Sequence, residues 1–440
     1  MKILFVSLGC DKNSVDSEVM LGHLVDSGYE FTDDENEADI AIVNSCCFIN
    51  DAKEESINTI ISLGELKESG KLKALILTGC LGQRYSDEIH TELPEVDAIV
   101  GISSIDSIAD VVKSVIEGQS QDVIGPLDAP IRGNKHRVMT TGGYSEYIKI
   151  AEGCDKHCTY CVIPKIRGPY RSIPMEDVVE EARTLAQSGV KELILVAQET
   201  TLYGMDLYGK KMLPELLHRL SQIEELAIIR ILYLYPEEIT DELIECIASE
   251  PKIANYVDIP IQSGSDRILK LMGRRTSRSE IYELVGKLRE RIPDICIRTT
   301  LIAGFPGEGN KDFEDSLKMV EDLKFDRLGV FTYSQEDNTP AARMDNQIED
   351  DVKIDRMNEI MLCQQGIALK TNRTLIGRKM KVIIDGMIPE EKIYVGRTYR
   401  DIPDVDGCVF VNSPKELMSG DMVEVLITEA GEYDLVGDVV

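Results

Sequence analysis

The first part of the chain alternates short apolar runs with amphipathic stretches. Three runs are strand-like, at residues 2–8, 39–43 and 73–78. Three segments have the spacing of helices, near residues 16–27, 52–69 and 104–117. Strands that alternate with helices predict a parallel sheet covered on both faces. We therefore expect an N-terminal α/β domain over residues 1–120.

The alternation then stops and resumes on a larger scale. Residues 121–141 carry Gly, Pro, Asp and Asn without a period, which is typical of a linker. Beyond the linker, six runs are strand-like, at residues 146–151, 192–197, 228–233, 256–259, 295–303 and 328–333. Six strand-helix units predict a partial TIM-type barrel, (β/α)6, over residues 142–368. The active site of such a barrel lies at the C-terminal ends of its strands.

The last part of the chain, residues 372–440, has a third character. Its strand-like runs are short, and Gly, Pro and Asp turns separate them. This pattern predicts a small all-β barrel. The fold class expected for the whole chain is thus a multidomain α/β protein with a parallel-sheet domain, a partial barrel and a small β-barrel.

Composition narrows the class of protein. Hydrophobic residues make up 43% and charged residues 29%, values typical of a globular protein that is neither disordered nor membrane-bound. No apolar run reaches 18 residues, and the opening segment lacks the cleavage site of a signal peptide, so we expect a cytoplasmic protein. A net charge of -30 argues against broad binding to nucleic acid and favours a basic protein partner. The alternative is that the charge only keeps the chain soluble.

Three of the 11 cysteines lie in one loop directly after the first predicted barrel strand. Cys154, Cys158 and Cys161 have the spacing C-x3-C-x2-C. Three thiolates from one loop can hold three irons of a 4Fe-4S cluster and leave the fourth iron open for the amino and carboxylate groups of S-adenosylmethionine (SAM). For Cys158 and Cys161 alone, a zinc site or a thiol redox pair is the alternative.

Three more cysteines follow the three strand-like runs of the first domain. Residues that follow parallel strands meet at one edge of the sheet, so Cys10, Cys46 and Cys80 are expected to converge on a second cluster. Cys47 adjoins Cys46, and neighbouring side chains diverge, so only one of the two is expected to be a ligand. The alternative is that these cysteines are small buried hydrophobes.

The cysteine loop, including the aromatic Tyr160, resembles the signature of the radical SAM superfamily. The segments around the N-terminal cysteines (SLGCDKNSVDSE, NSCCFI and GCLGQRY) look like the three cysteine motifs of the methylthiotransferases. This resemblance covers nearly the whole chain. It implies an auxiliary 4Fe-4S cluster on Cys10, Cys46 and Cys80, a radical SAM cluster on Cys154, Cys158 and Cys161, and a C-terminal TRAM domain.

Within this family, one branch modifies tRNA adenosine and another modifies an aspartate of ribosomal protein S-twelve. The segments GVFTYSQEDNTPA and GRTYRDIPDVDG resemble the protein-modifying branch, whereas Gln262-Ser263-Gly264-Ser265 is closer to the tRNA branch. Residues 372–440 carry 8 Lys and Arg against 13 Asp and Glu, and an acidic barrel binds phosphate poorly but suits a basic protein. We therefore expect the protein substrate and no direct nucleic-acid substrate.

Further residues are candidates for contacts with SAM by their position after predicted strands. They are Gln198, Glu199, Gln262, Ser263 and Arg298, besides Tyr160 of the cysteine loop. For Gln198 and Glu199 the alternative is a loop of capping residues, and for Gln262 and Ser263 it is a strand-to-helix turn. No side-chain acid or base is expected beyond the cluster ligands, since the five histidines form no constellation.

The resemblance also implies a reaction. One SAM would methylate a sulfur carried at the auxiliary cluster, and another would supply the radical that removes a hydrogen from the β-carbon of the target aspartate. The expected partners are ribosomal protein S-twelve, a low-potential electron donor such as flavodoxin or ferredoxin, and a sulfur donor. Two alternatives stay open at this point: a tRNA adenosine methylthiotransferase, and a non-enzymatic iron-sulfur or zinc protein that binds ribosomal partners.

Overall fold

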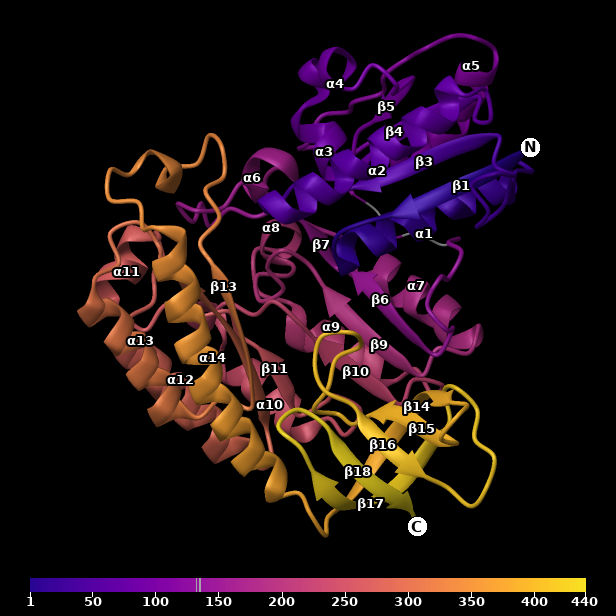
Figure 1. Ribbon diagram of the computed structural model, residues 1–440. Coiled ribbons are helices and arrows are strands. Elements are labelled where there is room, and N and C mark those ends of the chain that lie inside the picture. Colours follow the sequence, from indigo (N-terminus) through magenta and orange to yellow (C-terminus); the bar gives the residue numbers. More distant parts are fainter. Residues whose placement is uncertain (132, 134–135) are drawn as a thin grey trace.

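The computed structural model describes residues 1–131, 133 and 136–440. It has three parts: an N-terminal parallel-sheet unit, a half barrel in the middle and a small closed β-barrel at the C-terminal end (Figure 1). The predicted fold class is confirmed. In Figure 1 the N-terminal unit lies above the upper ends of the half-barrel strands, and the closed barrel lies at their lower ends.

The N-terminal unit is a five-stranded parallel sheet in the order β2-β1-β3-β4-β5. Its strands are β1 (Lys2–Ser7), β2 (Glu30–Phe31), β3 (Ile40–Ser45), β4 (Ala74–Thr78) and β5 (Ala98–Val100). Its helices are α1 (Asp11–Asp26), α2 (Asn50–Glu68), α3 (Gly79–Arg84), α4 (Ser86–Glu92) and α5 (Ile108–Ile116), with a 3-10 turn at Ile105–Ser107. Every residue of β3 is buried, because one apolar layer covers each face of the sheet.

The half barrel has six parallel strands. They are β6 (Ser145–Lys149), β9 (Glu192–Val196), β10 (Ile228–Ile231), β11 (Tyr256–Asp258), β12 (Cys296–Ala303) and β13 (Arg327–Thr332). They pair as β10-β9-β6 and β11-β12-β13, and the backbone N–H of Leu234 joins the two sets by donating to the Asp258 carbonyl at 2.9 Å. The long outer helices are α7 (Met175–Gln187), α9 (Leu213–Ser221), α10 (Asp241–Ser249), α12 (Arg278–Arg291), α13 (Asn310–Leu323) and α14 (Asp350–Arg373).

Short elements decorate the loops of the half barrel. They are β7 (Ala151–Glu152), β8 (Arg171–Ser172), α6 (Ile163–Ile166), α8 (Met205–Tyr208), α11 (Asp266–Leu271) and 3-10 turns at Pro236–Glu238 and Ala341–Arg343. The largest apolar cluster lies between the barrel strands and the outer helices. Strand residues therefore alternate between this layer and the barrel interior, as period-2 side chains do.

The C-terminal part is a closed barrel in the order β14-β15-β16-β18-β17. Its strands are β14 (Lys379–Ile388), β15 (Ile393–Arg397), β16 (Val409–Asn412), β17 (Met422–Ala430) and β18 (Leu435–Val439). The segment between β15 and β16 leaves this barrel and enters the half barrel from below. There Ile402 packs with interior residues of the half-barrel strands, among them Tyr256 and Cys296.

The expected linker is held against both of the domains that it connects. Its described residues contain no helix or strand, and residues 132, 134 and 135 of the expected range lie outside the description. Arg137 nevertheless lies 3.3–3.4 Å from three carboxylates, those of Glu18 on α1, Glu146 on β6 and Glu181 on α7. Each of the four side chains is at most 3% exposed. The linker thus fixes the N-terminal unit to the half barrel through buried charge.

The structure differs from the sequence prediction at the start of α1. This helix begins at Asp11, whereas the apolar spacing predicted a start near residue 16. Its first turn is polar but faces the half barrel, so Lys12 and Asn13 are buried without contributing to hydrophobic periodicity. The sequence pattern also could not predict the shortest elements, because they have too few residues to show a period. These elements are β2, β5, α3 and α4.

No helix in the described ranges is both long and apolar enough to cross a membrane.

A buried carboxylate joins the half barrel to the closed barrel. Glu192, at the start of β9, pairs with Arg230 of β10 at 2.8 Å and with Arg397 of β15 at 2.7 Å. Burial alone would raise the pKa of Glu192, but the two guanidinium charges outweigh it and lower the pKa to about 2. The contribution of this carboxylate to stability is therefore present above its ordinary pKa and is lost as the pH falls towards 2.

Removing this charge tests whether it anchors the closed barrel. Glu192→Gln leaves the buried guanidinium of Arg230 without its carboxylate and leaves Arg397 with Asp385 alone, so it should lower the free energy of unfolding by about 3–5 kcal/mol. Urea unfolding followed by circular dichroism measures the change, and the loss of stability of the wild type in acid should be shallower in the variant. Lys318→Gln, in an exposed pair on α13, is the control and should leave the midpoint unchanged. An unchanged midpoint for Glu192→Gln would contradict the anchoring role.

Candidate functional site

The loop that carries the C-x3-C-x2-C motif follows β7 at the upper end of the half barrel. Cys154 and Cys158 are buried and Cys161 is partly buried. Burial raises the pKa of the Cys154 thiol to about 12, and nearby negative charge, including that of Cys158, contributes to the rise. Burial also raises the pKa of Cys161, and charges on Cys158 and Cys154 add to it. All three thiols stand within eight residues of one loop, and each of the charges on Cys154 and Cys158 contributes to the pKa of a neighbouring thiol.

Backbone contacts from distant elements hold this loop in place. Gly153, directly before Cys154, has φ +81°, and a Cβ there would lie 2.1 Å from the Pro169 carbonyl oxygen, so only glycine fits. The Thr159 N–H donates to the Met272 carbonyl at 2.9 Å. The Cys158 Sγ lies 3.3 Å from the hydroxyl of Tyr235, which follows β10. The loop is thus fixed from both halves of the barrel.

The predicted aromatic residue of the loop, Tyr160, forms one end of an aromatic row. Its ring packs edge-on against Phe305, with centroids 6.5 Å apart, and Phe305 packs edge-on against Tyr333 at 5.6 Å. Phe305 belongs to the Gly-Pro turn after β12. The structure therefore places that turn beside the cysteine loop.

The three N-terminal thiols lie at the carboxyl edge of the five-stranded sheet. Cys10 stands directly before α1 and is exposed, Cys46 follows β3, and Cys80 lies in the first turn of α3. Burial raises the pKa of Cys46 to about 11, and charges on Cys80 and Cys10 add to the rise. A Cβ added to Gly9 would lie 3.1 Å from the Cys46 sulfur, which shows how closely the two strand ends approach.

Cys47 is fully buried in the apolar layer that also contains Ile60 and Leu63 of α2. Its backbone carbonyl accepts a hydrogen bond from Arg84 at 3.1 Å. Cys80 belongs to the same layer, and its charge adds to burial in raising the pKa of Cys47 to about 12. The choice of Cys46 over Cys47 as a ligand therefore stays a prediction.

One layer of buried charge separates the two sets of thiols. Arg167, which follows α6, is 2% exposed. Its guanidinium donates to the Cys80 sulfur at 3.4 Å, to Asp16 of α1 at 2.8 Å and to Glu152 of β7 at 3.2 Å. Burial alone would raise the pKa of Glu152, but Lys149 and Arg167 outweigh it and lower the pKa to about 2. This network could not be predicted from the sequence, because its members are up to about 150 residues apart along the chain.

Two of the predicted SAM contacts already have partners at the cysteine loop. The amide of Gln198 accepts from the Gly153 N–H at 2.7 Å and donates to Glu152 at 2.7 Å. Glu199 is fully buried, and burial raises its pKa to about 7 despite Lys156 at 3.6 Å. The Glu199 Oε2 atom has no hydrogen-bond partner among the described residues. Both residues lie beside the cysteine loop, and their contact with SAM stays a prediction.

The other residues predicted to contact SAM lie deeper in the half barrel or on its helix side. Arg298 of β12 pairs with Asp258 at 2.9 Å and with Asp406 of the inserted C-terminal segment at 3.6 Å. Ser263 is buried, and its hydroxyl lies 3.4 Å from that of Ser316 on α13, on the helix side of the barrel. Gln262 has φ 78° and pairs through its backbone with β12. The structure thus brings Ser263 and Arg298 less close to the cysteine loop than Gln198 and Glu199.

Sequence reasoning missed two buried cations at this site, one from the N-terminal unit and one from the half barrel. Lys12 of α1 places its Nζ atom 3.3 Å from the centre of the Tyr233 ring, just after β10. Arg274 lies over the ring of Tyr235 at 4.1 Å. Lys12 stands inside the first cysteine motif, so its position two residues after Cys10 was the available signal.

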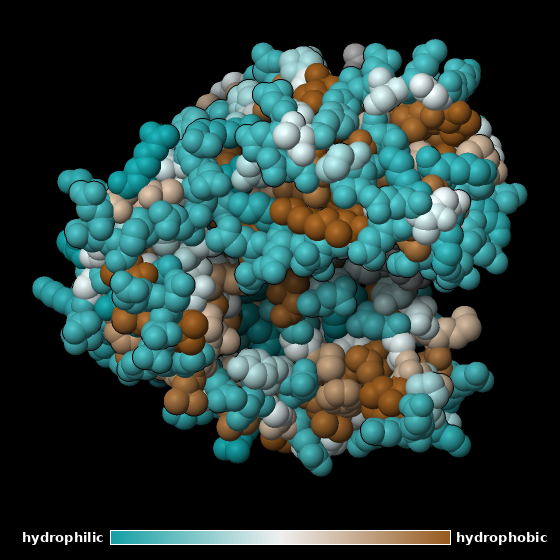
Figure 2. Space-filling model, turned by 45° about the horizontal axis from the view of Figure 1, so that its top comes forward, coloured by the Kyte–Doolittle hydropathy of each residue, from teal (hydrophilic) through white to brown (hydrophobic). Residues whose placement is uncertain are grey.

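The upper and lower parts of the molecule enclose a recess. Figure 2 shows it in the middle of the visible face, and most residues seen inside it are hydrophilic. In the described residues, no three or more His, Cys, Asp or Glu side chains are grouped as ligands of a single metal ion. In an iron-sulfur cube each thiolate binds a separate iron, and the two sets of three thiols, four of them buried, match that donor requirement.

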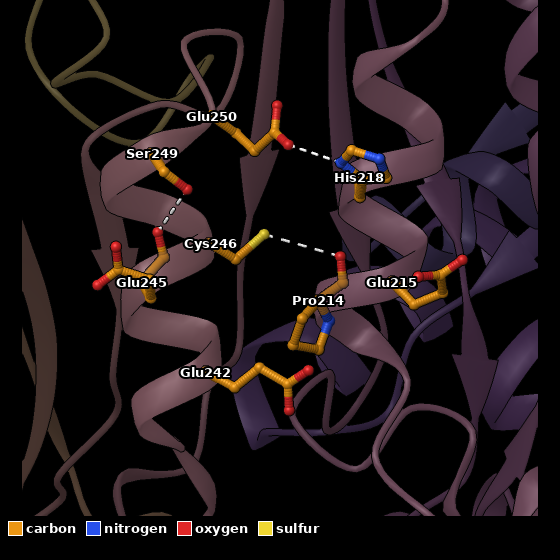
Figure 3. Close-up of a pocket in the computed structure, with 8 residues that line it drawn as sticks. All are labelled: Pro214, Glu215, His218, Glu242, Glu245, Cys246, Ser249 and Glu250. Atoms are coloured by element: carbon orange, nitrogen blue, oxygen red, sulfur yellow. Dashed lines mark hydrogen bonds and ion pairs between the residues drawn. The ribbon is translucent and has the colours of Figure 1, made fainter.

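A second hollow lies away from this site. A groove of about 360 Å³ between α9 and α10 is lined by Glu242, Glu245, Cys246 and other residues (Figure 3). The Cys246 thiol donates to the Pro214 carbonyl at 3.7 Å, and His218 pairs with Glu250 at 2.7 Å. This groove lies between outer helices rather than at the strand ends, so it is not the predicted site.

Comparison with known proteins matches each part of the chain separately. Residues 2–101 match the uncharacterized protein family UPF0004, residues 148–320 match the radical SAM superfamily and residues 376–440 match the TRAM domain. The solved structure of the radical SAM methyltransferase TsrM from Kitasatospora setae, with cobalamin and a [4Fe-4S] cluster bound, has a TM-score of 0.55 at 15% identity. That alignment covers 77% of this chain and 76% of TsrM, and it shows a shared fold. The predicted radical SAM enzyme with its SAM and iron-sulfur cofactors is confirmed at the level of the superfamily.

Full-length relatives identify the family. The ribosomal protein uS12 methylthiotransferase RimO of Lachnoclostridium phytofermentans is 59% identical over 437 residues, which cover 99% of both chains. The protein of the same name from Clostridioides difficile is 48% identical over 439 residues, covering 100% of this chain and 99% of its own. Both alignments extend across all three parts of the structure. The chain therefore belongs to the RimO family of radical SAM methylthiotransferases.

Proposed function

We propose that this chain adds a methylthio group to the β-carbon of an aspartate in ribosomal protein uS12, the S-twelve protein of the small subunit. One observation carries the proposal: the buried Arg167 links the two sets of thiols, because it donates both to the Cys80 sulfur and to Glu152, two residues before Cys154. A methylthio transfer needs a radical source and a sulfur source within reach of one substrate atom. The names of the full-length relatives supply the substrate.

The thiols divide into two ligand sets. Cys154, Cys158 and Cys161 hold the radical SAM cluster, and Cys10, Cys46 and Cys80 hold the auxiliary cluster. When bound, these cofactors supply the radical and the sulfur chemistry. The chain itself orients the cysteine loop and excludes water from it, since Cys154 and Cys158 are buried. Arg167 keeps a positive charge against the Cys80 sulfur, which stabilises a thiolate at that position.

The remaining assignments belong to the same proposal. The SAM-binding candidates are Tyr160, Gln198, Glu199, Gln262, Ser263 and Arg298, of which Gln198 and Glu199 have the strongest support because they lie beside the cysteine loop. The domains are set at residues 1–120, 142–368 and 372–440. We further infer a cytoplasmic enzyme that receives electrons from a flavodoxin or ferredoxin and sulfur from a separate donor.

The acidic surface supports a protein substrate over tRNA. The net charge of the whole chain is -30, and the first 120 residues alone hold 23 Asp and Glu against 8 Lys and Arg. Such a surface repels the phosphates of tRNA and attracts a basic ribosomal protein. The identity with the uS12-modifying relatives supports the same choice, although Ser263 follows the pattern of the tRNA branch.

The first test compares the two substrates. The reconstituted enzyme, SAM and a reductant should produce a methylthio mass gain on one aspartate of uS12, detected by mass spectrometry under anaerobic conditions. Bulk tRNA treated in parallel should stay unmodified. Methylthio adenosine in the tRNA, with uS12 unchanged, would overturn the substrate while keeping the reaction.

Cysteine variants test the division into two sites. Cys158→Ala should abolish SAM cleavage, because it removes a ligand of the cluster that starts the reaction. Cys80→Ala should still release 5'-deoxyadenosine from SAM but make no methylthio product. Cys246→Ala, whose thiol donates to the Pro214 carbonyl away from both sets of thiols, is the matched control and should behave as the wild type. A methylthio product from Cys80→Ala would refute the auxiliary site.

A further inference from the structure

The ammonium group of Lys12 lies where the N-terminal unit meets the interior of the half barrel. Its Nζ atom is 3.3 Å from the centre of the Tyr233 ring and 2.8 Å from the Asp11 carboxylate. The Lys12 side chain is 9% exposed. Because Lys12 follows Cys10 by two residues and Tyr233 follows β10, this charge stands between the auxiliary thiols and the barrel.

Three other buried cations near the thiols are committed to carboxylates on different elements. Arg167 and Lys149 each pair with both Asp16 and Glu152. Lys156 has three carboxylates within 3.6 Å. Within the described parts of the chain, the one carboxylate paired with Lys12 is its neighbour Asp11. A lysine has three N–H donors, so Lys12 keeps donors for a further acceptor.

Asp11 adds a free acceptor at the same place. Its Oδ1 atom accepts from Lys12 and from the Tyr233 hydroxyl, the latter at 3.2 Å. Its Oδ2 atom is buried and has no hydrogen-bond partner among the described residues. Buried polar atoms are normally satisfied, so an unpaired carboxylate oxygen indicates a donor that arrives with a ligand. Lys12 and Asp11 together offer donors and an acceptor, which match a side-chain carboxylate and a backbone N–H.

This place can be reached from solvent. Cys10 is exposed and Tyr233 is partly exposed. The recess in Figure 2 lies between the same parts of the molecule and is hydrophilic. A loop of a substrate protein can therefore enter beside Lys12.

The proposed reaction dictates what must bind there. The β-carbon of an aspartate carries its carboxylate directly, so a carbon held between the two thiol sets brings a negative charge into a space with little water. A desolvated carboxylate is costly unless a cation pairs with it. We propose that Lys12 binds the carboxylate of the target aspartate and thereby selects aspartate over asparagine. This inference rests on the proposed function.

A purely structural role for Lys12 makes a different prediction. The contact between Lys12 and Tyr233 joins the two domains. If this were its only role, losing it would weaken the interface and lower activity on every target alike. A carboxylate-binding role instead changes the preference between two targets that differ in one charge. The ratio of the two activities therefore separates the roles.

The experiment uses the reconstituted enzyme and full-length uS12 with either aspartate or asparagine at the target position. The wild type should favour aspartate by about tenfold or more in kcat/KM. Lys12→Met should lower kcat/KM for aspartate by about tenfold or more and bring the two targets within about twofold of each other. Binding of the two uS12 forms in the absence of SAM, measured as Kd, should show the same loss of preference without any turnover.

Two further variants complete the test. Lys12→Arg keeps the charge and should retain the preference for aspartate. Lys353→Met is the matched control, because Lys353 is also a buried lysine near a tyrosine ring, 5.6 Å from Tyr333, and pairs with Asp350 on its own helix. The Asp/Asn ratio should stay at the wild-type value in this control.

The outcomes are distinct. If Lys12→Met lowers both activities equally and keeps the ratio, Lys12 is a structural contact and the inference is overturned. If Lys12→Met fails to load iron, Lys12→Gln replaces it, and a wild-type ratio in that variant overturns the inference too. If the wild-type enzyme makes no methylthio product on either uS12 form, the proposed function fails, and the inference fails with it.

Discussion

A guanidinium group taken out of water must be paired, and the docking of the N-terminal unit onto the half barrel follows from that requirement. Arg167 carries its charge into the interface, where Asp16 of one domain and Glu152 of the other compensate it. Arg137 repeats the arrangement with Glu18 and two carboxylates of the half barrel. Such pairs fix orientation more than they add stability, because removing either partner leaves an uncompensated buried charge. The mutual position of the two thiol sets is a result of this pairing.

The local pattern of apolar and polar residues was sufficient to predict the architecture. All six strands of the half barrel lie within two residues of where apolar runs predicted them, because the apolar residues of these runs pack into the core and the barrel interior. The start of α1 was missed for the opposite reason: its first turn is buried through polar groups, which carry no hydrophobic signal. The insertion of Ile402 into the half barrel was equally invisible, since one apolar residue in a turn has no period.

The candidate site likewise has residues that could be predicted from the sequence and residues that could not. Thiols at strand ends could be predicted to share one edge of the sheet, and Cys10, Cys46 and Cys80 do lie at that edge, while their role as cluster ligands stays a prediction. Polar partners that meet across long sequence separations could not. The pairing of Arg298 with Asp406, for instance, depends on how the C-terminal segment enters the barrel. Position in a motif places a residue near a site, but the groups that surround it are decided by tertiary packing.

The ionic interface also limits how freely the three parts could be exchanged during evolution or by engineering. A graft of another N-terminal unit onto this half barrel would leave Arg167 and Arg137 with only their half-barrel carboxylates unless the incoming helix supplied carboxylates at the positions of Asp16 and Glu18. An apolar interface tolerates such exchange with some repacking, whereas a buried charge that loses part of its compensation opposes docking. The family fold is therefore modular in appearance, yet its domains are matched parts that must be inherited together.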